Sequence, residues 1–189
     1  PAEPKDHFVS TEELLDCDDL GEALREGRAL RPARGYRFLL AQGDLNFQSR
    51  QVSDPVPLGR QLLEAGALNP GDGYSLFAIL PAGDFEDVRL DEPFDLRERG
   101  AERFIAFLTD RDFKLTLNEN ELRWGTPIIS GAVLYGLAKP AEEEGVFLNV
   151  PGGEDRLIEP GELIDLTVPG VERFITAPVT TVALLGSGP

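Results

Sequence analysis

The tetrapeptide Glu-Arg-Phe-Ile occurs twice, and this repetition constrains the fold more than any other feature of the sequence. Residues 100–106 read Gly-Ala-Glu-Arg-Phe-Ile-Ala, and residues 170–176 read Gly-Val-Glu-Arg-Phe-Ile-Thr. The acids Glu102 and Glu172 lie 70 positions apart. The pattern of apolar, polar and turn-forming residues before each copy also matches over the length of one small domain. A repeat at a fixed spacing indicates that one structural unit is present twice.

The first unit is predicted to span residues 35–108. Its strands are predicted from runs of apolar residues and from alternation with polar ones, its turns from Gly, Pro and Asp, and its helix from an apolar stripe at helical spacing. The segment 74–80 is the most apolar and has the composition of a strand that is buried on both faces. In chain order the predicted elements are strands at 36–41 and 45–48, a helix at 59–67, and strands at 74–80, 87–90 and 103–107.

The second unit is predicted to span residues 112–178 and to repeat this order. Residues 126–131 match residues 54–59 at the start of each helix. The second copy is three or four residues shorter after the helix, in a loop, where a change of length costs little. In chain order the predicted elements are strands at 113–118 and 122–124, a helix at 132–138, and strands at 146–150, 156–158 and 170–176.

A hairpin, a crossing helix and further strands form the element order of a β-grasp domain, in which the helix covers one face of a mixed sheet. We therefore predict an α+β fold with two β-grasp domains in tandem. The linker at 108–111 is too short to leave much freedom between them.

Residues 1–34 form an N-terminal arm before the first domain. Ser10 or Thr11 has the chemistry of a helix N-cap, and Asp19 is suited to cap a second short helix over 20–26. A basic segment then leads into the first domain. Two interpretations stay open: the arm lies loosely on the first domain, or it is a docking peptide for a partner.

The composition excludes several classes of function. The formal net charge of −16 over 189 residues argues against nucleic acid or an anionic membrane as a partner. Cys17 is the only cysteine, so no internal disulfide is possible, which suits the cytoplasm. His7 is the only histidine, and neither a nucleophile–base set nor a cluster of metal ligands is apparent. We therefore expect no catalytic residue, metal, cofactor or membrane span.

Three motifs carry a resemblance to a known family: Tyr36-Arg-Phe at the start of a unit, Pro127-Ile-Ile-Ser-Gly131 before a helix, and Gly-x-Glu-Arg-Phe at the end of each unit. With the segment 20–28, they resemble the bacterial multiubiquitin group, ubiquitin-like proteins with tandem β-grasp domains. Such proteins are encoded beside an E1-like activating enzyme, an E2-like conjugating enzyme and a JAB-type zinc isopeptidase. The resemblance implies a ubiquitin-like modifier that is joined through its C-terminus to amines of protein targets. A role in anti-phage defence follows by analogy with related operons.

A modifier of this kind needs a glycine at the end of an extended tail, because the absence of a Cβ lets the tail enter a narrow active-site channel. Residues 179–189 are the expected conjugation tail, which is apolar and then glycine-rich. We favour removal of Pro189, which would expose Gly188 for conjugation. The alternatives are Gly186 as the working terminus, with a longer leader removed, and a tail end without a function.

Three residues are candidates for contact with a partner. Glu172 and Arg173 form an acid–base pair at the start of a strand, which is most simply a local ion pair or a loop anchor. Trp124 is most simply a core or half-buried residue of its strand.

Two functions from other classes stay open. A scaffold whose β-grasp domains only dock proteins would keep its function when the tail is deleted. A sulfur carrier would bear a thiocarboxylate at its C-terminus, and one domain would suffice for it.

Overall fold

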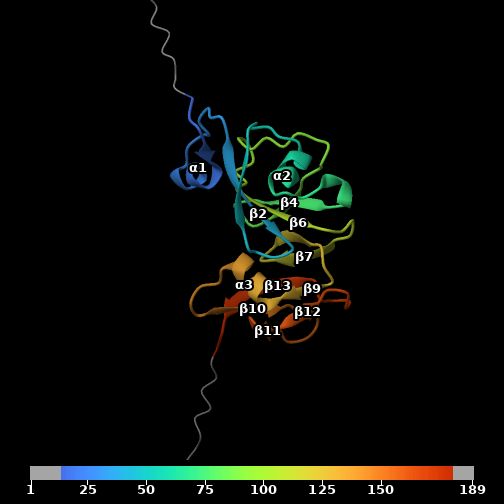
Figure 1. The fold of residues 1–189 in the computed structure, drawn as a ribbon. Coiled ribbons are helices and arrows are strands. Elements are labelled where there is room, and N and C mark those ends of the chain that lie inside the picture. Colours follow the sequence, from blue (N-terminus) through green and yellow to red (C-terminus); the bar gives the residue numbers. More distant parts are fainter. Residues whose placement is uncertain (1–13, 181–189) are drawn as a thin grey trace, which may run out of the picture.

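The computed structural model of the chain describes residues 14–180 and has an α+β fold with two units in tandem (Figure 1). In Figure 1 the first unit lies above the second, and the arm, in blue, lies beside the first unit. Each unit has one α-helix packed on a mixed sheet, as the sequence predicts. This arrangement is the tandem ubiquitin-like fold.

The arm and the first unit share one sheet, in the order β1-β2-β6-β4-β5, with β3 paired to the other side of β2. The β2 strand is antiparallel to β3 and parallel to β6, which gives the mixed sheet of a β-grasp fold. The elements are β1 (Asp18–Asp19), α1 (Leu20–Glu26), β2 (Tyr36–Gln42), β3 (Gln48–Val52), α2 (Gly59–Ala65), the 3₁₀ turn η1 (Pro70–Asp72), β4 (Ser75–Ile79), β5 (Phe85–Asp87) and β6 (Arg103–Phe107).

The second unit has a sheet in the order β11-β10-β13-β7-β8 and a separate small pair, β12 with β9. Its central strands pair as in the first unit, since β13 is parallel to β7 and antiparallel to β10. The elements are β7 (Phe113–Leu117), β8 (Asn120–Trp124), β9 (Ile128–Ser130), α3 (Gly131–Ala138), β10 (Glu144–Leu148), β11 (Arg156–Ile158), β12 (Leu163–Asp165) and β13 (Arg173–Pro178).

The two units repeat each other closely at the start of the helix. The Gly59 amide donates to the Glu92 carbonyl at 3.3 Å, and the Gly131 amide donates to the Glu162 carbonyl at 2.8 Å. A methyl group at either glycine would overlap a backbone carbonyl of the loop that crosses the helix start. Both glycines are therefore required for the helix to approach this loop closely.

The sheet of the first unit is buried on both faces. Because successive side chains of a strand point to opposite faces, β4 and β6 each contribute to two cores. One face packs on α2 and the other on the second unit, so the first sheet lies between them (Figure 1). The residues on the α2 face are Leu76, Ala78, Phe104 and Ala106, and those on the face toward the second unit are Phe77, Ile79, Ile105 and Phe107.

The contact between the units is close-packed around an aromatic pair. The rings of Phe107 and Trp124 meet edge to face, with centroids 5.0 Å apart and planes at 73°. Gly125 follows Trp124, and a methyl group at this position would overlap the Phe107 side chain. The two units thus have separate sheets and helices but share one continuous apolar cluster.

The predicted hairpin of the first unit is wrong in its second strand. Residues 45–48 alternate apolar and polar, yet β3 starts only at Gln48. The Leu45 and Phe47 side chains instead pack on the apolar cluster shared with the second unit. The segment predicted at 87–90 is also displaced, because β5 starts at Phe85 and ends at Asp87.

A buried carboxylate holds the folded arm together. The side chain of Asp18 is fully buried and accepts hydrogen bonds from both terminal nitrogens of Arg28, each at 2.9 Å. It also accepts from the Arg31 amide at 2.8 Å and from the Arg31 guanidinium at 3.0 Å. Burial alone would raise the pKa of Asp18, but these hydrogen bonds outweigh it and hold the pKa well below its usual range. The arm lies on the first unit because β1 pairs with β2, and because Leu20 and Ala33 are buried in the core of that unit. The described part of the arm is thus packed on the first unit and not loose.

We expect Asp18→Asn to destabilise the arm by about 2 kcal/mol, because hydrogen bonds to charged groups contribute about 1.5–3 kcal/mol each. Folding lowers the pKa of Asp18, so its contribution is present above the unfolded pKa of about 4 and is lost as the pH falls below that value. Hydrogen exchange of the α1 amides at pH 7 measures the loss. Urea unfolding from pH 7 to pH 3 should show the difference from wild type shrinking. The matched control is Asp16→Asn, at an exposed site, which should change neither result.

We expect Gly125→Ala to weaken the contact between the units by about 1–3 kcal/mol, because the added methyl group overpacks the Phe107 site. Calorimetry should show one transition for the wild-type protein and a lower, broadened or split transition for the variant. Gly161→Ala is the control, since a methyl group there meets no atom within 4 Å. Equal melting of both variants would contradict the shared cluster.

Candidate functional site

The predicted conjugation residues Gly186, Gly188 and Pro189 lie outside the described residues. The last contact before them is made by Val179, whose amide donates to the Glu143 carbonyl at 2.9 Å. This hydrogen bond extends the pairing of β13 with β10 by one residue. The pairing of the final strand thus extends to Val179, the first residue of the predicted tail.

Glu172 and Arg173 lie at the start of β13 and are both exposed. Their backbone groups hold the sheet together: the Glu172 carbonyl accepts from the Thr116 amide, and the Arg173 carbonyl accepts from the Asn149 amide, both at 2.8 Å. Neither side chain has an ion pair within the described part of the chain. The backbone fixes these residues, and the side chains remain accessible from solvent.

Trp124 lies in the contact between the two units and not on an exposed surface. Its side chain is 2% exposed, and its indole Nε1 donates to the Ile128 carbonyl at 3.1 Å. The ring packs on Phe107 of the first unit. Trp124 therefore contacts a partner domain within its own chain.

The second unit presents a sheet face that the sequence analysis did not single out. Phe147 and Ile175 are register partners on β10 and β13, as Phe77 and Ile105 are on β4 and β6. The pair in the first unit is buried under the second unit, whereas Phe147 and Ile175 are only half-buried. The repeat could have revealed this face, because Phe147 and Ile175 lie 70 positions after Phe77 and Ile105, the same spacing as between the two Glu-Arg-Phe-Ile motifs.

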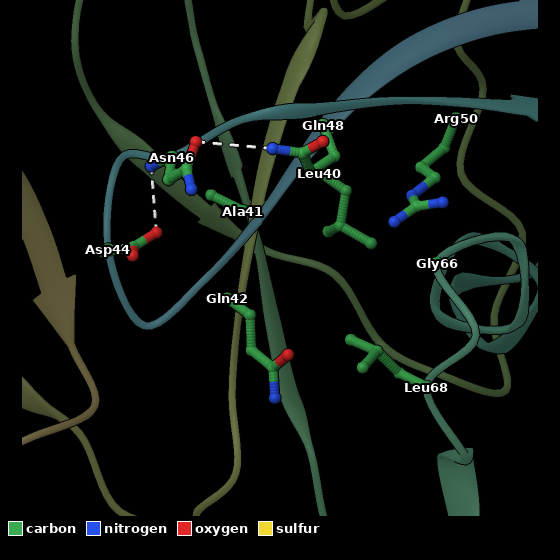
Figure 2. A pocket seen from close by; sticks show the side chains of 9 residues that line it. All are labelled: Leu40, Ala41, Gln42, Asp44, Asn46, Gln48, Arg50, Gly66 and Leu68. Atoms are coloured by element: carbon green, nitrogen blue, oxygen red, sulfur yellow. Dashed lines mark hydrogen bonds between the residues drawn. The ribbon is translucent and has the colours of Figure 1, made fainter.

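The first unit has a polar cavity beside the edge strand β3. It measures about 200 Å³ and lies between the β2–β3 hairpin and the end of α2. Figure 2 shows the Arg50 side chain reaching from β3 into this space, near Leu40 and Gly66. The Arg50 Nε is buried and has no hydrogen-bond partner within the described residues. A guanidinium in this setting is suited to a carboxylate supplied from outside the unit.

The sequence profile of the multiubiquitin family matches residues 42–109 and 113–179. The chain belongs to the multiubiquitin family. The two matches correspond to the two structural units, although the first begins only at the last residue of β2. A search of curated proteins finds no match.

The described residues of this multiubiquitin-family protein contain no group of three or more His, Cys, Asp or Glu that could hold a metal ion. Cys17 is half-buried at the start of the arm, and its thiol points to the Asp18 carbonyl at 3.6 Å. His7 lies outside the described residues. No helix between residues 14 and 180 is long and apolar enough to cross a membrane.

We expect Trp124→Ala to destabilise this multiubiquitin-family protein by about 3–5 kcal/mol, because the substitution leaves a cavity in the contact between the units. Glu172→Ala and Arg173→Ala serve as controls and should each change the free energy of unfolding by less than about 0.5 kcal/mol, since both side chains are exposed. Urea unfolding followed by circular dichroism measures all three. A small effect of Trp124→Ala would contradict a structural role for this residue.

Proposed function

We propose that the chain is a ubiquitin-like protein modifier, activated at its C-terminus by an E1-like enzyme and conjugated to amines of target proteins. The observation that carries this proposal is membership of the multiubiquitin family together with two ubiquitin-like units. In the second unit, the last strand is followed in the sequence by a segment that contains two glycines. A modifier is the substrate of its pathway, so its own residues supply a tail and a docking surface and no catalytic group.

The partners in this proposal are an E1-like activating enzyme, an E2-like conjugating enzyme, a JAB-type zinc isopeptidase and the protein targets. The isopeptidase would remove Pro189 and expose Gly188. ATP would then adenylate the Gly188 carboxylate with release of pyrophosphate, and a cysteine thiol of the activating enzyme would displace AMP to form a thioester. Anti-phage defence in the bacterial cytoplasm is the setting that we propose for this pathway.

Two features of the described residues favour a modifier over an enzyme. The cavities at β3, at the end of α2, beside α1 and beside β8 are small and polar, and none of the described residues that line them form a convergent nucleophile and base. The accessible sheet face around Phe147 and Ile175 lies on the unit that leads into the tail. A face of this kind would let an enzyme hold the unit while the tail enters its active site.

The test is charging of the protein by the E1-like activating enzyme that this proposal requires, with ATP present. A chain from which Pro189 is deleted should form a thioester that reducing agent cleaves, visible by gel electrophoresis and mass spectrometry. Gly188→Ala in that chain should lower the rate of charging by about a hundredfold, the order of loss when reacting atoms are displaced by about an ångström. Ser187→Ala is the matched control and should charge at the wild-type rate.

Different failures point to different alternatives. Charging of a chain that ends at Gly186, but not of the chain that ends at Gly188, would move the working terminus to Gly186. A defence phenotype that survives deletion of residues 181–189 would favour the non-conjugated scaffold. A C-terminal thiocarboxylate detected by mass spectrometry would favour the sulfur carrier.

A further inference from the structure

The contact between the two units joins two different surfaces. On the first unit it uses the β4–β5 turn (Pro81–Asp84) and the sheet face beside it, here named the turn surface. On the second unit it uses β8 and the end of α3, here named the groove. The Asn120 side-chain amide donates to the Ala82 carbonyl at 2.9 Å, and the Glu121 backbone amide donates to the Asp84 carboxylate at 2.9 Å.

The second unit carries its own turn surface, which is free within the described residues. Its turn is Pro151–Glu154, where the first unit has Pro81–Asp84. Both turns close with the same hydrogen bond, from Gly83 to Leu80 at 2.9 Å and from Gly153 to Val150 at 3.0 Å. All residues of the second turn are exposed, and the sheet face beside it is only half-buried. The surface that binds the second unit in one copy of the repeat is thus unoccupied in the other.

The first unit carries its own groove, beside β3 and the end of α2. The groove of the second unit holds a cavity of about 230 Å³ that Ala82 and Gly83 of the turn surface help to line. The cavity of about 200 Å³ in the first unit lies at the same place in the repeat, but only first-unit residues line it. The two grooves therefore differ in whether a turn is seated in them.

The register of the hairpins places Ser49 where the second unit has Glu121. Leu39 is the register partner of Ser49, and Thr116 is that of Glu121. The Leu39 amide donates to the Glu102 carbonyl, and the Thr116 amide donates to the Glu172 carbonyl, each at 2.8 Å. Both amides thus point away from the hairpin partner. In an antiparallel pair, two directly opposed residues either both point their backbone N–H and C=O groups toward each other or both point them away from each other. The Ser49 amide therefore points outward from the sheet edge, as the Glu121 amide does where it binds Asp84.

Arg50 takes the place of the fully buried Leu122 in this register. Its guanidinium lies in the cavity (Figure 2) and has neither a hydrogen bond nor an acid within 4 Å among residues 14–180. An acidic side chain at the tip of an incoming turn would meet both the Ser49 amide and the Arg50 guanidinium. Glu154, at the tip of the free turn, has this chemistry.

We propose that the groove of the first unit binds the Pro151–Glu154 turn of a second copy of this chain, repeating the contact between the two units. The two surfaces differ, so the contact is head to tail and extends to further copies without closing into a two-fold dimer. This assembly goes beyond the proposed function and does not depend on conjugation of the tail.

The contact between copies is more polar than the contact within the chain. The positions of Ile79 and Phe107 in the first turn surface are taken by Asn149 and Ala177 in the second. The net charge of −16 also opposes association of identical copies. The assembly should therefore be weak, in rapid exchange, and dependent on the pairing of Arg50 with Glu154.

Sedimentation of the full chain at increasing concentration tests this assembly. The wild-type protein should show a weight-average mass that rises with concentration. Arg50→Glu and Glu154→Arg should each weaken self-association by about tenfold or more, because like charges then meet in the contact. An equimolar mixture of the two variants should restore it, since each then offers the other an opposite charge.

The controls are Arg34→Glu and Glu142→Arg, which make the same charge changes at exposed sites and should leave self-association unchanged. Circular dichroism of each variant checks that it is folded. A wild-type mass that stays monomeric at millimolar concentration would overturn the proposal. Failure of the mixture to restore association would overturn it as well, and would leave Arg50 as an inward-pointing charge that protects the edge of β3.

Discussion

The burial of the first sheet on both faces is the constraint on which the rest of the structure depends. A sheet with one helix has a second face that must be solvated or covered. In the first unit, alternate residues of β4 and β6 are apolar on both faces, so the second face needs a cover. The second unit supplies that cover and becomes part of the same apolar cluster. The relative position of the two units therefore follows from the side chains of the first sheet.

Because the second unit, which covers the first sheet, is a copy of the first unit, each unit has one surface that the contact between them does not use. The second unit uses its groove in the contact, and its own sheet face lies outside the contact. The first unit uses its sheet face in the contact, and its own groove lies outside it. The free surfaces are more polar than the ones in contact, with Arg50 in place of Leu122 and Asn149 in place of Ile79. This difference in polarity is consistent with a tight contact inside the chain and the weaker one that we propose between copies.

The sequence was sufficient to predict the repeat, the α+β class and the element order, because these depend on periodicity and turn residues within each unit. The helix starts were also predictable, since Gly59 and Gly131 follow matching segments. The prediction of a strand at 45–48 was wrong because Leu45 and Phe47 alternate with polar residues, as in a strand, but pack on the apolar cluster shared with the other unit. Local patterns show that a side chain is apolar but not which part of the chain buries it. The same limit hid the cavity around Arg50 and the burial of Asp18, because both depend on residues that are distant in the sequence.

The shared cluster also means that the two copies of the duplicated unit are no longer interchangeable. Cutting the chain at the linker would leave the N-terminal half with a bare apolar face of four large side chains, which favours aggregation. The C-terminal half would chiefly uncover Trp124 and the end of one helix. The first copy therefore depends on its neighbour to cover its apolar sheet face, whereas the second is closer to a self-sufficient domain.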